Sequence, residues 1–150
     1  MSVDNFPAVV CRTRANPSAG FSVVKVENPS NTQPRAHGLN KAPDLILGKA
    51  YAPSQNEPWH IFHSALGKGY YGKFDDGAFV SHDQWGTHDP DSNVFYVKPN
   101  TGSGANYNSG MIYCIWTAVD GYSAFGKYSS SNSVSGFVHL GFKPAYLLIK

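Results

Sequence analysis

The apolar stretch Met111 to Val119, MIYCIWTAV, decides the fold class of this chain. It contains no charged residue, and its Ile, Tyr, Trp, Thr and Val are residue types that favour β-strands. An unbroken apolar run of this kind is typical of a strand that is buried on both faces. A short buried helix is the competing interpretation, which the β-branched and aromatic content disfavours. The stretch is about half as long as a membrane-spanning helix, so we expect no membrane insertion.

Shorter strand-like segments lie on both sides of this stretch, separated by turns rich in Gly, Pro, Asn and Ser. Together they predict an all-β fold, an antiparallel β-sandwich of the jelly-roll or concanavalin-like kind with about nine or ten short strands. The segments are FSVVKV (21–26), DLILGKAY (44–51), WHIFHSAL (59–66), GKGYYGKF (67–74), VFYV (94–97), GYSAFGKY (121–128), FVHL (137–140) and AYLLIK (145–150).

The connecting segments are predicted from their turn residues. The segment NPSNTQPRAHG (28–38) contains two prolines, which exclude a helix or a central strand and indicate a long polar turn. Residues 79–93 are polar and predicted to be irregular. Residues 1–19 are interpreted as a leader or an edge strand, and residues 20–150 as a single β-sandwich domain.

Composition narrows the classes of function. The chain has 150 residues, of which 15% are charged and 14% aromatic, with a net charge of +2. No run of Lys or Arg resembles a surface that follows phosphates, so we expect no nucleic-acid partner. The start, MSVDNFPAVVC, lacks the basic and apolar regions of a signal peptide, which predicts synthesis in the cytoplasm. Cys114 lies in the apolar stretch and is expected to be a small buried side chain, not half of a disulfide with Cys11.

The sequence contains an internal repeat. Residues 20–49 align without a gap on residues 121–150, with eight identical pairs in thirty where chance gives about two. The identical pairs are Gly20/Gly121, Ser22/Ser123, Ser30/Ser131, Asn31/Asn132, Leu39/Leu140, Pro43/Pro144, Leu47/Leu148 and Lys49/Lys150. Two interpretations stay open: residues 121–150 begin a second unit of a tandem array, or the two copies are equivalent strand pairs within one sandwich.

These segments also resemble a known family. HGLNKAPDLILGK (37–49), WHIFHSALG (59–67), SNVFYV (92–97) after Trp85, and the long stretch from Gly110 to Lys150 are similar to a tandem domain of virion structural and tail-fibre-like proteins of marine and cyanobacterial bacteriophages. The resemblance covers about residues 20–150, with departures at Asn40 and in residues 75–84.

This resemblance implies a sandwich-like fold and a virion-associated role. The expected location is the virion, after synthesis in the host cytoplasm, and the expected partners are other virion proteins and further copies of the chain. The resemblance implies no catalytic residues and no cofactor, and it does not specify a place in the particle.

One short motif imitates a calcium-binding loop. Asp89, Asp91 and Asn93 place oxygen ligands at alternate positions, as such loops do. The continuation does not fit, because Val94 stands where the loop needs Gly and Asn100 where it needs Glu. We therefore expect a polar turn and no metal site. His60 and His63 are three residues apart and would not share a face of a strand, so they do not predict a metal site either. No nucleophile motif such as G-x-S-x-G is present, which argues against an enzyme.

The segment around Trp85 is the strongest candidate for ligand binding. His82, Asp83, His88 and Asp89 surround this Trp in the sequence. An aromatic ring beside carboxylates can hold a sugar, so the alternative function is a lectin-like adhesin module that binds glycans of the host surface. The competing interpretation is that Trp85 closes one end of the sandwich as part of its core.

Overall fold

The computed structural model describes residues 11–27, 33–51, 58–98, 110–128 and 137–150. These residues contain nine β-strands and one short 3-10 turn (η1), and no α-helix. None of them forms a helix that could cross a membrane. The elements are β1 (Cys11–Asn16), η1 (Pro17–Ala19), β2 (Phe21–Val26), β3 (Pro34–Ala36), β4 (Leu45–Ala50), β5 (His60–His63), β6 (Tyr70–Lys73), β7 (Val80–Ser81), β8 (Val94–Tyr96) and β9 (Met111–Trp116).

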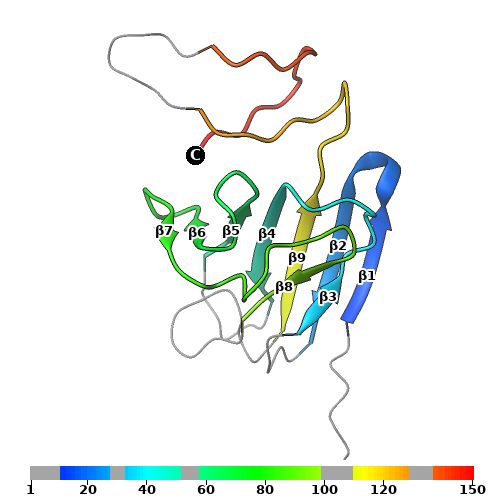
Figure 1. The fold of residues 1–150 in the computed structure, drawn as a ribbon, viewed down its shortest axis with the longest axis vertical. Helices are drawn as coiled ribbons and strands as arrows, with labels where there is room; N and C mark the ends of the chain where they lie inside the picture. The colour runs from blue at the N-terminus through cyan, green and yellow to red at the C-terminus, as the bar shows by residue number, and fades with distance from the viewer. Residues whose placement is uncertain (1–10, 28–32, 52–57, 99–109, 129–136) are drawn as a thin grey trace, which may run out of the picture.

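Seven strands form one antiparallel sheet in the order β1-β2-β9-β4-β5-β6-β7 (Figure 1). The stretch that decides the fold supplies β9, which lies between β2 and β4. Val24 of β2 pairs with Tyr113, and Ile46 of β4 pairs with Ile115. The strand interpretation of Met111 to Trp116 is therefore confirmed over the helical one.

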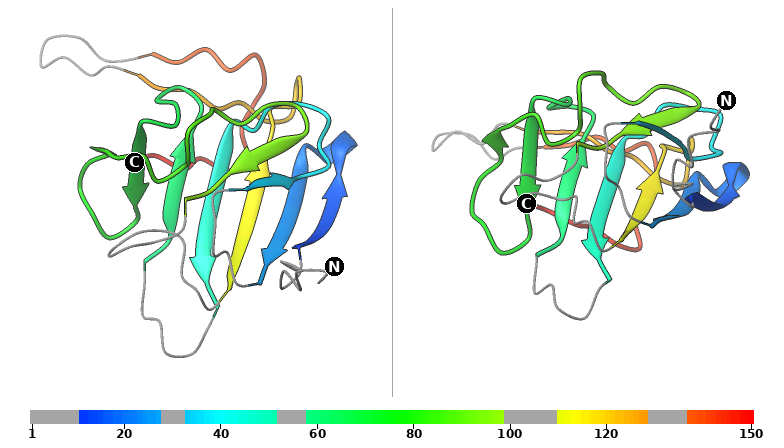
Figure 2. Two further views of the ribbon diagram at one scale, coloured as in Figure 1. Left: turned by 60° about the horizontal axis from the view of Figure 1, so that its bottom comes forward. Right: turned by 90° about the horizontal axis from the view of Figure 1, so that it is seen from below.

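A second layer, the two-stranded sheet of β3 and β8, lies across one face of the large sheet (Figure 2). The fold is thus an all-β, antiparallel sandwich, as predicted. Alternate residues of β2, β9, β4 and β5 point into the space between the layers, as the two-residue period of a strand requires. The buried core consists of Val24, Val26, Leu39, Ile46, Ala50, Phe62, Trp85, Phe95, Val97, Met111, Tyr113 and Ile115.

The opposite face of the large sheet is apolar as well, but only half-buried. Leu47 of β4 pairs with Cys114 of β9 on this face, and both are partly exposed. The unbroken apolar pattern of β9 therefore corresponds to one fully buried and one half-buried face. Cys114 and the exposed Cys11 are both free thiols, and burial raises the pKa of the Cys114 thiol.

Of the segment predicted to be a leader or an edge strand, residues 1–10 lie outside the described residues, and Cys11–Asn16 forms an edge strand of the sheet. β1 pairs with β2 along its whole length, and Asn16 caps η1 by accepting a hydrogen bond from the Ala19 N–H at 3.2 Å. Gly20 then reverses the chain with a φ of +60°. A Cβ atom there would meet the Thr117 carbonyl oxygen and approach Val119 Cγ2 to 2.7 Å. Glycine is therefore required both by the left-handed backbone conformation and by the lack of space for a side chain.

The strand predictions fail in the C-terminal part. Residues 121–128, 137–140 and 145–150 were predicted to be strands, and the structure gives them no strand. Beyond an isolated bridge between Val119 and Ser123, the described part of this region has no ladder partner. β9, from which the chain departs, already has β2 on one side and β4 on the other, so no place for a following strand is left beside it.

Two smaller differences concern the first half. Of the polar turn predicted for residues 28–38, residues 28–32 lie outside the described part of the chain, and the rest contains β3. Pro34 begins β3 at the edge of the small sheet, a position that tolerates proline. The strands predicted over 59–66 and 67–74 are shorter in the structure, and a turn that includes Gly67, with a φ of +72°, joins β5 to β6.

Candidate functional site

The segment that the sequence singled out begins with a tight turn after β7. The His82 N–H donates to the Gly69 carbonyl at 2.9 Å and prolongs the pairing of β6 with β7. The Gly86 N–H then donates to the Asp83 carbonyl at 3.1 Å, with Gly86 at a φ of +80°. This turn directs Trp85 into the sandwich and leaves His82 and Asp83 exposed.

Trp85 is completely buried and belongs to the core between the layers. Its ring packs edge-on against Phe62, with the ring centroids 5.7 Å apart. The prediction that Trp85 is an exposed platform for a sugar is therefore wrong for this structure. Its position agrees with the competing interpretation, in which Trp85 is part of the core of the sandwich. The Trp85 Nε1–H has no hydrogen-bond partner among the described residues.

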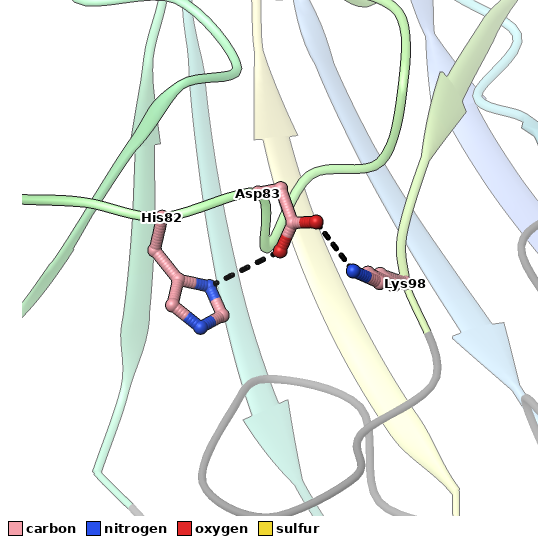
Figure 3. A network of polar contacts seen from close by, with 3 residues as sticks. All are labelled: His82, Asp83 and Lys98. Carbon is pink, nitrogen blue, oxygen red and sulfur yellow. Dashed lines mark hydrogen bonds and ion pairs between the residues drawn. The ribbon is translucent and has the colours of Figure 1, made fainter.

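His82 and Asp83 form a small polar network with Lys98, which follows β8 (Figure 3). His82 Nδ1 lies 3.7 Å from Asp83 Oδ1, and Lys98 Nζ donates to Asp83 Oδ2. The backbone brings Lys98 there, because its N–H donates to the Gln84 carbonyl at 3.1 Å. The Lys98 hydrogen bond, followed by the positive charge of Lys98, lowers the pKa of Asp83.

This network is at the surface, beside the partly buried ring of Tyr71. The His82 ring meets Tyr71 edge-on at a centroid distance of 5.3 Å. The sequence did not point to Lys98 or Tyr71 as members of this group. Lys98 follows β8 and reaches Asp83 through its backbone hydrogen bond to Gln84, whereas Tyr71 lies in β6 and reaches His82 through the pairing of β6 with β7.

The other two candidate residues have other partners. His88 packs against Tyr96 at a centroid distance of 5.3 Å, and its Nδ1 lies 2.8 Å from Thr87 Oγ1. Asp89 Oδ1 accepts the backbone N–H of Lys68 at 2.7 Å, so this carboxylate ties the segment to the turn between β5 and β6.

The calcium-like motif is a polar turn. Asp91 Oδ1 accepts the N–H groups of Asn93 and Val94 at 2.7 and 2.8 Å, and these two hydrogen bonds lower the pKa of Asp91. The Asn93 Nδ2 group donates to Ser92 Oγ at 3.2 Å within the same turn. No group of three or more His, Cys, Asp or Glu side chains able to hold a metal occurs among the described residues.

A buried histidine that the sequence did not single out fixes this turn to β3. The His37 Nε2–H donates to the Asp91 carbonyl at 3.0 Å, and His37 Nδ1 accepts the Leu39 N–H at 3.2 Å. Both ring nitrogens are therefore used by the neutral imidazole, and burial lowers the pKa of His37. This residue holds the second layer together but does not face solvent.

The most unusual surface of the molecule lies in residues 137–150, which carry apolar side chains exposed to solvent. Phe137 is 87% exposed, Tyr146 80%, Leu147 64% and Ile149 61%. This segment, orange to red in Figure 1, extends beyond the end of the large sheet and does not lie among its strands. Its last residue contacts the β6–β7 connection, because Lys150 Nζ donates to the Asp76 carbonyl and lies 5.9 Å from the Phe79 ring centroid.

The fold and these surfaces define an all-β sandwich domain with a polar network at one edge of its second layer and an exposed apolar segment. Residues 5–150 match the model of a family described as a domain of unknown function (DUF7483), and the chain belongs to that family. The match includes β1 and the exposed segment. No curated protein and no solved structure matches the chain.

Proposed function

We propose that this chain is a structural module of a bacteriophage virion, part of a tail fibre, of the tail or neck, or of the head decoration. It acts by assembly and surface contact and not by catalysis. The observation that carries the proposal is the exposed apolar surface of residues 137–150 on a rigid sandwich. The resemblance of residues 20–150 to virion and tail-fibre-like proteins supports the same role, and the virion is the location we propose.

The physical reason is the free energy of the exposed side chains. A Leu, Ile or Phe side chain gains about 1.5–3 kcal/mol when it moves from water to a buried site. Soluble monomers seldom expose apolar residues in a contiguous group, whereas surfaces that bind another protein do so. The expected partners are other virion proteins and further copies of this chain.

Mass spectrometry of purified particles, with immunogold labelling against the chain, tests the role. We expect the chain in particles at a constant ratio to the other structural proteins, with label at one location. Its absence from particles that form in cells producing it would refute the virion role.

A lectin-like adhesin module is the second candidate, favoured by the exposed network of His82, Asp83 and Lys98 beside Tyr71. Carboxylate, ammonium and imidazole groups next to an aromatic ring can bind hydroxyl groups of a sugar. A glycan array tests it with Asp83→Ala, and Asp120→Ala serves as a control at another exposed carboxylate. The adhesin role predicts retention that Asp83→Ala abolishes and Asp120→Ala preserves, and an array without retention would contradict it.

A further inference from the structure

Residues 144–149, PAYLLI, have the sequence of an interior strand. They are uncharged, and in an extended conformation both faces carry apolar side chains. The matching stretch in the first copy of the repeat, residues 43–48, contributes most of β4, where Ile46 is fully buried and Leu47 half-buried. β4 lies between β9 and β5. This molecule therefore already shows where such a sequence is stable: hydrogen-bonded beside another strand.

Neither of the chain's own sheet edges suits residues 144–149: the edge near Lys150, β7, has two residues, and the longer edge, β1, is at the other end of the sheet. β1 and β7 are the two edges of the seven-stranded sheet, with five strands between them. Lys150 is held at Asp76 and Phe79, in the connection between β6 and β7. A strand acceptor for this segment therefore has to come from another molecule.

β1 is the edge strand that offers a suitable acceptor. It has six residues, all with exposed side chains, and β2 is its single neighbour in the described part of the chain. The other edge, β7, has two residues. β1 carries Arg12 and Arg14 and no acidic residue, so two β1 strands from different copies would bring like charges together. A neutral segment such as 144–149 meets no such repulsion, and charges on an edge strand commonly serve to prevent pairing with a second identical edge.

We propose that residues 144–149 of one copy add as a strand to the edge of β1 in a second copy of this chain. Strand addition to an exposed sheet edge is an established mode of recognition, in which backbone hydrogen bonds supply affinity and side chains supply specificity. Because donor and acceptor are different surfaces, the contact is head-to-tail, and repeated contacts give a ring or an open filament. The inference rests on the proposed assembly role and identifies its partner and its contact.

Hydrogen exchange measured by mass spectrometry on the full chain tests this directly. The chain is compared at low concentration, where light scattering shows a monomer, and at high concentration, where it shows a larger species. We expect new protection of backbone amides in residues 11–16 and 145–150 of the larger species. Protection of 145–150 without protection of 11–16 would overturn β1 as the acceptor.

A matched pair of variants distinguishes this contact from nonspecific association through exposed apolar side chains. In the donor variant, Leu147→Asp is combined with Leu148→Asp, two exposed positions whose change does not threaten the fold. In the control, Tyr122→Asp changes an apolar residue that is 72% exposed and lies outside the segment. The donor variant is expected to weaken association about a hundredfold or more while the control associates like the unmodified chain. Equal weakening by both variants would overturn the proposal.

The outcomes distinguish this inference from the virion role. A chain that stays monomeric at every concentration overturns strand addition between copies, while its presence in particles still supports the virion role. A chain that associates through other strands, with residues 145–150 unprotected, also overturns the inference and leaves the assembly role in place.

Discussion

The two copies of the internal repeat have the same pattern and different structures. In the first copy, residues 20–49 contribute β2, β3 and most of β4, and Val24, Val26 and Ile46 are fully buried. In the second copy, residues 121–150 contain no strand in their described part, and Leu147 and Ile149 are largely exposed. A similar sequence is thus strand in one place and unpaired chain in the other.

The cause of the difference is the presence of a partner strand. β2 and β4 both pair with β9, which comes about 60 residues or more later in the chain and has room for one neighbour on each side. Since these two places are taken, the second copy leaves β9 through a turn closed by the Ser123 N–H donating to the Val119 carbonyl at 2.9 Å. A β-strand is therefore defined by its neighbours as much as by its own residues.

The largest effect is expected from one substitution made at matched positions. Ile46 and Leu147 occupy equivalent positions of the two copies, and one is fully buried while the other is 64% exposed. Ile46→Ala should lower the free energy of unfolding by about 2–5 kcal/mol, because it leaves a cavity in the core. Leu147→Ala should change it by less than about 0.5 kcal/mol. Urea denaturation of the monomer measures both values, and equal losses would show that the second copy is packed in solution.

A smaller difference is expected at the glycines that begin the two copies. Gly20 and Gly121 have φ values of +60° and +73°. Both Ala variants carry the cost of a left-handed conformation, about 1–2 kcal/mol. Gly20→Ala also forces its new methyl group against the Thr117 carbonyl and Val119, whereas nothing lies within 4 Å at Gly121. Thermal unfolding should therefore show a clearly lower Tm for Gly20→Ala than for Gly121→Ala, and the reverse order would contradict the turn geometry.

The smallest effect concerns pH. Burial lowers the pKa of His37 in the folded state, so the unfolded chain binds the proton more readily. The stability that neutral His37 gives is complete above its ordinary pKa of about 6.5 and is lost as the pH falls through the lower folded value. His63, whose pKa burial also lowers, adds a contribution of the same sign.

Substitution of one histidine by glutamine in each copy tests whether His37 is a source of this pH dependence. His37→Gln should cost about 1 kcal/mol at neutral pH, through its altered hydrogen bonds, and should flatten the loss of stability below pH 6.5. His139→Gln, at an exposed position of the second copy, should leave the profile unchanged. The measurement is the free energy of unfolding between pH 4 and pH 8, and an unchanged profile for His37→Gln would rule out His37 as the source.

The candidate site was only partly predictable. The residues around Trp85 were identified from local sequence, but whether the indole faces solvent depends on the turn that Gly86 closes and on the space beside Phe62. Lys98 joined the site through the pairing of separate segments, which local sequence does not report. For Asp91, the failure of the calcium pattern at Val94 correctly predicted a polar turn.

The sequence by itself determined the strand character of this protein. The β-branched and aromatic stretches at 21–26, 45–50 and 111–116, and the prolines and glycines between them, specify strands and turns through local sterics and an alternating side-chain pattern. Only the tertiary structure decided which apolar stretches become paired strands, because each place beside β9 can be filled once. That competition left residues 144–149 exposed, whereas Trp85 is buried by the turn that Gly86 closes and by its packing against Phe62. Both results depend on contacts between segments far apart in the chain.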